Sequence, residues 1–264
     1  MIGPTPLLDC FRRGEIPADV RMLAARGALT PRAYEQLAIL VLLVDDRDGG
    51  IREAAESTLA RIPVEALQSF LARSDIPVGL REFFADRGVF PAEMPPIESD
   101  EPLIDTEPAP QAEEEDATEP LEADENRATA VARIAKMGFS ERLKTAIKGT
   151  REMRAILIRD PNKVISTSVL SSPKLTDVEI ESFARMTTVP EEVLRIIGNN
   201  RIWLKNYSIL TCLTRNPKTP VAISLRLMNR LSDRDLTMLS VDRNVPDPLR
   251  IAARRKVVAG VSKK

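Results

Sequence analysis

Apolar side chains recur along much of the chain at intervals that place them on one face of an α-helix. Alanine, leucine, arginine and glutamate dominate the composition, and these residues favour helix. The pattern therefore predicts a chain built from helices. Two of the apolar faces are formed by Val178, Phe183 and Met186, and by Leu225, Met228 and Leu231.

Several short motifs mark the expected helix starts. A polar side chain before a proline can cap a free N–H, and proline at the first helical position loses no hydrogen bond. Thr176 and Glu179 have the spacing of a capping box, in which each side chain binds the backbone N–H of the other residue. The cap-proline pairs are Thr30-Pro31, Asp160-Pro161, Thr219-Pro220 and Asp247-Pro248.

Internal repeats predict how these helices are organised. Arg159-Asp160-Pro161 returns 56 residues later as Arg215-Asn216-Pro217, and Arg243-Asn244 follows 28 residues after that. A period near 28 residues fits a helix–turn–helix unit. A shift of 113 residues also aligns Phe70 with Phe183 and Pro77 with Pro190, which fits either a duplication or convergence on one helical pattern. We expect an all-α fold, an α-solenoid of short helical hairpins.

The charge distribution divides the chain into three parts. Residues 93–126 carry 14 acidic and no basic side chains, whereas residues 127–264 carry 27 basic and 12 acidic ones. The acidic stretch is rich in proline and poor in large apolar residues, so it cannot bury enough surface to offset the entropy of folding. We therefore predict helical repeat blocks at residues 5–92 and 127–260, separated by a disordered acidic linker at residues 93–126.

Composition argues against most catalytic chemistry. The chain has no histidine, and its two cysteines, Cys10 and Cys212, are far apart. It has no phosphate-binding glycine loop and no nucleophile elbow. We expect a non-enzymatic protein without cofactor or metal. The longest apolar run, residues 37–44, is too short to span a bilayer and no signal peptide is evident, so we expect a cytoplasmic protein without a membrane partner.

One acidic cluster invites comparison with a calcium loop. Asp45, Asp46 and Asp48 precede Gly49, but the glycine stands at the wrong position and Arg52 intrudes. The interpretation we favour is a solvated turn that caps the following helix.

A stretch of alternating basic and aromatic residues is the first candidate for partner binding. Arg201, Trp203, Lys205 and Tyr207 belong to the sequence RIWLKNY, in which Trp203 and Tyr207 would share a face of one helix. Basic groups can neutralise phosphate, and aromatic rings can stack on bases. The alternative for Trp203, which we favour, is a packed ring between repeats. Both interpretations stay open for Tyr207.

Further basic residues recur near the repeat turns and along the last helix. If the repeats stack in register, some of them would form a basic ridge that binds an anionic ligand. The alternative is a solvated surface with Asp233, Asp242 and Asp247 as local partners. The candidate residues are Arg215, Lys218, Arg243, Arg250 and Arg254, with Arg255 and Lys256 beside them.

The residues of two segments carry a family resemblance. DRDGGIREAAESTLA, with Ile51, Ala55 and Leu59, resembles the second helix of HEAT repeats, as does NVPDPLRIAARR with Leu249 and Ala253. The short unit and its Asn-Pro turn resemble leucine-rich-repeat-variant helical repeats, and residues 141–258 resemble a segment of uncharacterised bacterial proteins. The period is shorter than the roughly 40–47 residues of HEAT units. The resemblance implies a helical repeat fold and no catalytic motif.

These observations favour a scaffold or adaptor that binds a protein partner in the groove left by stacked repeats. The alternative is a nucleic-acid or nucleotide-binding module that uses the basic C-terminal block. In that case the acidic linker is an internal partner that masks the basic block, because tethering raises its effective concentration. The two functions differ in salt response, since phosphate binding weakens steeply with salt.

Overall fold

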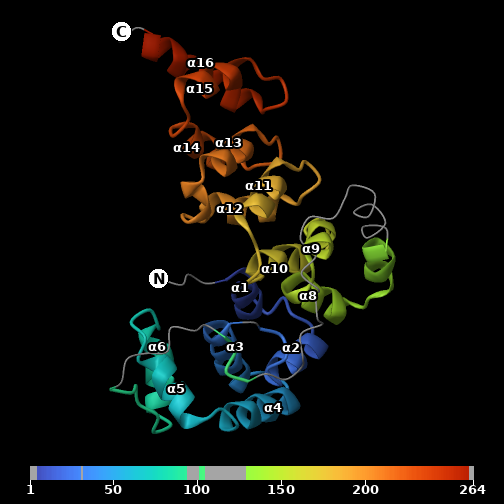
Figure 1. Cartoon of the computed structure of the whole chain (residues 1–264), viewed down its shortest axis with the longest axis vertical. Helices are drawn as coiled ribbons and strands as arrows, with labels where there is room; N and C mark the ends of the chain where they lie inside the picture. Colours follow the sequence, from blue (N-terminus) through green and yellow to red (C-terminus); the bar gives the residue numbers. More distant parts are fainter. Residues whose placement is uncertain (1–4, 31, 94–100, 105–128, 262–264) are drawn as a thin grey trace. The chain divides into compact units, whose positions relative to one another are not determined.

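The computed structural model describes residues 5–30, 32–93, 101–104 and 129–261. These residues form helices joined by short connections and contain no strand, which confirms the all-α class (Figure 1). None of the helices in these ranges is long and apolar enough to cross a membrane. The chain divides into two compact units. Unit 1 is Met1–Met153 with Ser171–Pro173, and unit 2 is Arg154–Leu170 with Lys174–Lys264.

Unit 1 is built around the apolar helix α3, which packs against α1, α2 and α4. The side chains of Leu37, Ile39 and Leu40 are buried in this core. The helices of unit 1 are α1 (Pro6–Arg12), α2 (Ala18–Ala25), α3 (Ala33–Val44), α4 (Gly49–Ala60), α5 (Val64–Leu71), α6 (Val78–Ala85), a helix at residues 129–136 and α8 (Phe139–Lys148).

The division between the units lies near residue 153, not within the predicted linker at 93–126. Residues 129–153, which follow the linker, fold with the N-terminal helices in unit 1. The Ser140 hydroxyl donates to the Asp19 carboxylate at 2.5 Å, and the Lys148 ammonium group donates to the carbonyl of Ala28 at 3.2 Å. The change in charge along the chain therefore does not coincide with the boundary in packing.

Unit 2 consists of helical hairpins in two layers. Helix α11 packs on α13 in one layer, and α12, α14 and α16 follow one another in the second layer. Within hairpins, α13 packs on α14 and α15 on α16. After α9 (Arg151–Leu157), which crosses the division between the units, come α10 (Lys163–Ser168), η1 (Val169–Ser171), α11 (Asp177–Arg185), α12 (Glu191–Asn199), η2 (Trp203–Lys205), α13 (Tyr207–Arg215), α14 (Val221–Met228), α15 (Asp233–Val241) and α16 (Asp247–Val261).

The turn between the helices of a hairpin repeats in detail. The side chains of Asp160, Asn216 and Asp242 each accept the backbone N–H two residues later, at 2.8, 3.0 and 2.9 Å. Because Asp242 is the residue equivalent to Asn216, the predicted match of Arg243-Asn244 to Arg215-Asn216 is wrong by two residues. The side-chain cap of the turn, and not the arginine, sets the register.

The predicted helix starts are partly confirmed. Thr176 and Glu179 form the capping box of α11, with Thr176 N–H to Glu179 Oε2 at 3.1 Å. However, the cap of α10 is Asn162 and not Asp160, because Asp160 makes the preceding turn. Helix α3 begins after Arg32 and α14 begins after Pro220, so both starts lie one or two residues later than the motifs suggested.

Part of the predicted linker is described, and it is ordered. The backbone N–H of Leu103 donates to the side-chain oxygen of Gln36 in α3 at 2.8 Å. The prediction of disorder is therefore wrong for residues 101–104, which have a specific partner in unit 1. Of the remaining linker residues only Glu93 is described, and the prediction for the others falls outside the described residues.

Candidate functional site

The predicted basic and aromatic string at residues 201–207 does not form one helix. Trp203 and Lys205 belong to the short helix η2, whereas Tyr207 is the first residue of α13. Asn206 separates the two elements by capping α13, so Trp203 and Tyr207 do not share a helical face as predicted. Trp203 is half-buried, and Arg201 and Lys205 are exposed.

Tyr207 and Arg215 connect α13 with α15 in the next hairpin. The Tyr207 hydroxyl donates to Asp235 Oδ2 at 2.5 Å and accepts the backbone N–H of Ser232 at 2.9 Å. Arg215 donates to Asp235 Oδ1 at 2.8 Å. The pKa of Asp235 is lowered, first by the hydrogen bond from Tyr207, then by that from Ser232, with a smaller contribution from the charge of Arg215. In this geometry both residues join neighbouring repeats.

This cluster makes stability depend on pH. Because the pKa of Asp235 is lowered in the folded chain, its carboxylate contributes stability above its unfolded pKa of about 3.9, and that contribution is lost as pH falls through the folded pKa. Tyr207→Phe removes the leading cause. We expect the urea midpoints of wild type and Tyr207→Phe to differ most near neutral pH and to approach each other at acid pH, as the pH falls through the folded pKa of Asp235. An equal difference at both pH values would contradict this role.

Arg250 and Arg254 are also held by contacts inside the last hairpin. Arg250 pairs with Asp247 at the start of α16, and Arg254 donates to the carbonyl of Ser240 at 2.8 Å. Lys218 and Arg243 are exposed in the two turns that follow α13 and α15. Of the predicted basic residues near the turns, these two are the ones whose charged groups have no partner in the described part of the chain.

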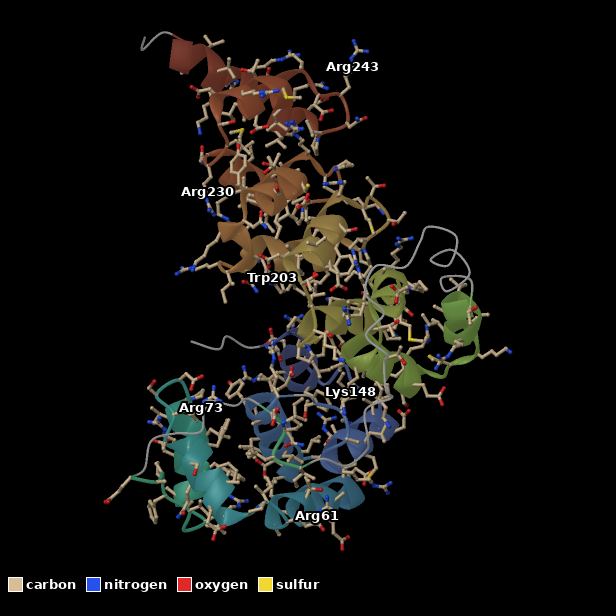
Figure 2. The ribbon with its side chains drawn as sticks, viewed as in Figure 1. Arg61, Arg73, Lys148, Trp203, Arg230 and Arg243 are labelled. Atoms are coloured by element: carbon tan, nitrogen blue, oxygen red, sulfur yellow. The ribbon has the colours of Figure 1, made fainter. Side chains whose placement is uncertain are left out.

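The basic residues lie on two opposite edges of the hairpin stack. Hydrogen bonds from Asn216 to the carbonyls of Ala184 and Met186, at 2.8 and 2.9 Å, bring together the turns that follow α11 and α13. The connections that follow α12 and α14 lie on the other edge. Figure 2 shows Arg243 on the first edge and Arg230 on the second. The structure thus places the two sets of candidate residues on different edges, Lys218 and Arg243 on the first and Arg201 and Lys205 on the second.

The second edge carries more positive charge than the sequence suggested. Arg226 donates to the carbonyl of Gly198 at 2.5 Å and to Asn199 Oδ1 at 2.9 Å. Arg230 donates to the carbonyl of Leu204 at 2.8 Å, and Lys256 to Asn229 Oδ1 at 3.1 Å. All these acceptors are uncharged, so the contacts position the cations without neutralising them. We define the basic edge as Arg201, Lys205, Arg226, Arg230 and Lys256.

Arg226 and Arg230 are absent from the candidates chosen by sequence, although the sequence held a signal for Arg230. The repeats can be aligned on the proline that precedes each of α12, α14 and α16. In this alignment Asn200, Arg230 and Lys256 occupy equivalent positions. Arg230 bonds just beyond the C-terminal end of α12, and Lys256 bonds just beyond that of α14. Positive charge is favourable there because the helix dipole makes this end partially negative. The position can be recognised only once the repeat register is known.

An exposed aliphatic residue lies among these cations. Ile202 is 70% exposed and stands between Arg201 and the half-buried ring of Trp203, with Lys205 in the same connection. An aliphatic side chain gains nothing from water, and two exposed cations, Arg201 and Lys205, belong to the same connection. The basic edge therefore carries an exposed apolar residue next to exposed cations.

The acidic cluster near α4 is a turn, in agreement with the interpretation we favoured. Asp46 accepts the N–H of Asp48 at 2.9 Å and pairs with Arg21, and Asp48 caps α4 through the N–H of Gly50 at 2.9 Å. Within the described ranges, no group of three or more cysteine, aspartate or glutamate side chains could hold a metal ion.

The chain matches no protein-family model, no curated protein and no solved structure. The resemblance to HEAT repeats and leucine-rich-repeat variants therefore stays a prediction from the sequence. What can be argued about function rests on the hairpin stack of unit 2, its basic edge and the exposed Ile202.

Proposed function

We propose that the chain is a non-enzymatic binding scaffold, an α-solenoid that recognises a protein partner, and that the basic edge of unit 2 is the recognition surface. The observation that carries this proposal is Ile202, which is 70% exposed among the cations of that edge. Protein interfaces gain most of their affinity from a few apolar or aromatic anchors that become buried on binding. The partner that fits is an acidic protein surface with an apolar centre.

The free energy available from burying Ile202 favours a protein partner over nucleic acid. Fully burying an isoleucine side chain contributes about 1.5–3 kcal/mol, and a sugar–phosphate backbone offers no apolar surface on which Ile202 could obtain it. The surrounding cations add on-rate and specificity more than affinity, because they lie at the rim of the contact and are screened by salt. Ile202 therefore accounts for affinity, and Arg201 and Lys205 account for the preference for an acidic surface.

One observation favours nucleic acid as a second candidate. The side chains that accept from Arg226 and Lys256 are amides, so the positive charges of this edge remain available to phosphate. In this function the acidic linker would compete with nucleic acid for the same cations. The acidic stretch at 105–126 that would do so falls outside the described residues.

Matched double variants test whether the basic edge is the recognition surface. Arg201→Ser/Lys205→Ser removes two exposed cations from the basic edge, and Lys218→Ser/Arg243→Ser removes two from the opposite edge. With a polyglutamate peptide as probe at low salt, we expect the first pair to weaken binding about tenfold and the second pair to change it by less than about twofold. Equal loss in both variants would show general charge attraction and remove the case for this edge.

A further inference from the structure

Gln36 in helix α3 is a fully buried polar residue whose partners come mainly from a distant part of the chain. Its side-chain amide nitrogen donates to the carbonyl of Ile104 at 3.0 Å and to that of Gly27 at 3.2 Å. Its oxygen accepts the N–H groups of Leu103 and Ile104, at 2.8 and 3.3 Å. Figure 1 shows this short segment, residues 101–104, beside α3.

These contacts recognise a peptide backbone. One amide side chain offers a donor and an acceptor to the backbone of the same short segment, which bends at residues 103 and 104, so the hydrogen bonds place few demands on the segment's side chains. Burying an amide without hydrogen bonds costs several kcal/mol in an apolar interior, and three of the four contacts of Gln36 are to the segment. A polar residue at this position in an apolar helix is therefore explained by a bound peptide backbone.

A small side-chain position adjoins the amide. Gly27 has a φ of +82°, and a Cβ added there would lie 3.7 Å from Ile104 Cγ2 and 3.5 Å from Thr58 Cγ2. The aliphatic side chain of Ile104 thus lies over the glycine and near the Thr58 methyl group. A β-branched or other aliphatic residue of the peptide fits this position.

The bound segment itself is not part of the core. Glu101 is exposed and Pro102, Leu103 and Ile104 are only half-buried, whereas Gln36, Gly27 and Thr58 are buried. The receiving surface is thus complete within α2, α3, α4 and their connections. Among the described residues, the segment contacts that surface through the amide of Gln36 and through the side chain of Ile104 over Gly27.

We propose that Gly27, Gln36 and Thr58 form a peptide-recognition site, the Gln36 site, and that residues 101–104 are its resident ligand. The site takes a short segment of a partner protein with an aliphatic residue over Gly27 and acidic neighbours, because the resident segment reads DEPLID in the sequence. Tethering gives the resident ligand an effective concentration in the mM range, so it excludes weak ligands and yields to stronger ones. This site belongs to unit 1 and is independent of the basic edge.

Binding of a labelled DEPLID peptide to full-length variants tests the proposal. Leu103→Pro/Ile104→Ser removes one N–H donor and the aliphatic contact of the resident ligand. We expect this variant to bind the free peptide at least about tenfold more tightly than wild type does, because the site is vacated. Adding Gln36→Leu should abolish that binding, and a DEPSSD peptide should not bind. Absence of DEPLID binding to the folded Leu103→Pro/Ile104→Ser variant would overturn the proposal.

A second measurement on the wild-type chain covers the case in which a variant does not fold. Hydrogen exchange is followed at the amides of Leu103 and Ile104 with and without millimolar DEPLID peptide. Displacement should raise exchange at these two amides at least about fivefold while the amides of α3 stay protected. Unchanged exchange at saturating peptide would show a fixed structural strap and contradict the proposal. Ile202→Ser should alter neither readout, which separates this site from the proposed function.

Discussion

Replacing Glu179 with alanine is expected to lower the free energy of unfolding by about 3–5 kcal/mol, the largest effect of a single substitution that we predict. Glu179 and Arg154 form an ion pair whose side chains are only 4% and 5% exposed. The pair is bidentate, with Arg154 Nε to Glu179 Oε1 and Arg154 Nη2 to Glu179 Oε2 both at 3.0 Å. The substitution leaves a buried guanidinium without its carboxylate and also opens the capping box of α11. Urea unfolding followed by circular dichroism measures it.

Two control variants separate buried charge from charge in general. Arg154→Met/Glu179→Leu removes both charges, and we expect it to recover much of the loss, because two apolar side chains avoid the desolvation of an unpaired ion. Arg185→Ala breaks the pair with Glu181, in which the arginine side chain is 72% exposed, and should lower the free energy of unfolding far less than Glu179→Ala does, because solvent screens the pair. A loss in Glu179→Ala as small as that in Arg185→Ala would show that the buried pair does not hold α9 to α11.

Asn216→Ala is expected to lower the free energy of unfolding by about 2–4 kcal/mol. Asn216 is buried, donates to the carbonyls of Ala184 and Met186 in the preceding repeat, and accepts the N–H of Lys218 in its own turn. Alanine leaves these backbone groups without partners where water has little access. Thermal unfolding at neutral pH measures the change.

The equivalent residue of the last hairpin is the matched control. Asp242 makes the same turn through the N–H of Asn244, and its side chain makes no described contact with the preceding repeat. Asp242→Ala should therefore cost only about 1 kcal/mol. If the two alanine variants are equally destabilised, the bonds from Asn216 to the neighbouring turn do not contribute, and the repeats are joined by apolar packing alone.

Local signals in the sequence predicted the all-helical class and one of the helix caps. The capping box at Thr176 and Glu179 is formed as expected, because a cap depends on residues that are three positions apart. The apolar faces were less reliable. Phe183 is buried, but Val178 on the same predicted face is 64% exposed, since the buried face of α11 runs through Ile180, Phe183 and Ala184. Spacing identifies a helix more securely than it identifies the side that packs.

The features that matter for binding depend on partners far apart in the chain. Gln36 meets Leu103 and Ile104 across 67 and 68 residues, and Arg230 meets Leu204 across 26. No local pattern marks such a pairing, so neither the ordered part of the linker nor the grouping of these cations on one edge could be predicted, although Arg201 and Lys205 were recognised as candidates. Tyr207 illustrates the reverse case. Its aromatic ring and basic neighbours suggested ligand binding, whereas its hydroxyl bonds to Asp235 and Ser232 of the next hairpin.

The measurement that tests the proposed scaffold most directly is the binding of two peptides to Ile202→Ser. One probe is polyglutamate with a central pair of leucines, and the other has serines in their place. At moderate salt we predict that wild type binds the leucine probe about tenfold more tightly, that Ile202→Ser abolishes this preference, and that Val241→Ser, a variant of a residue 67% exposed on α15, retains it. If Ile202→Ser keeps the preference, or if single-stranded DNA binds more tightly than either peptide regardless of residue 202, the basic edge is not a protein-recognition surface.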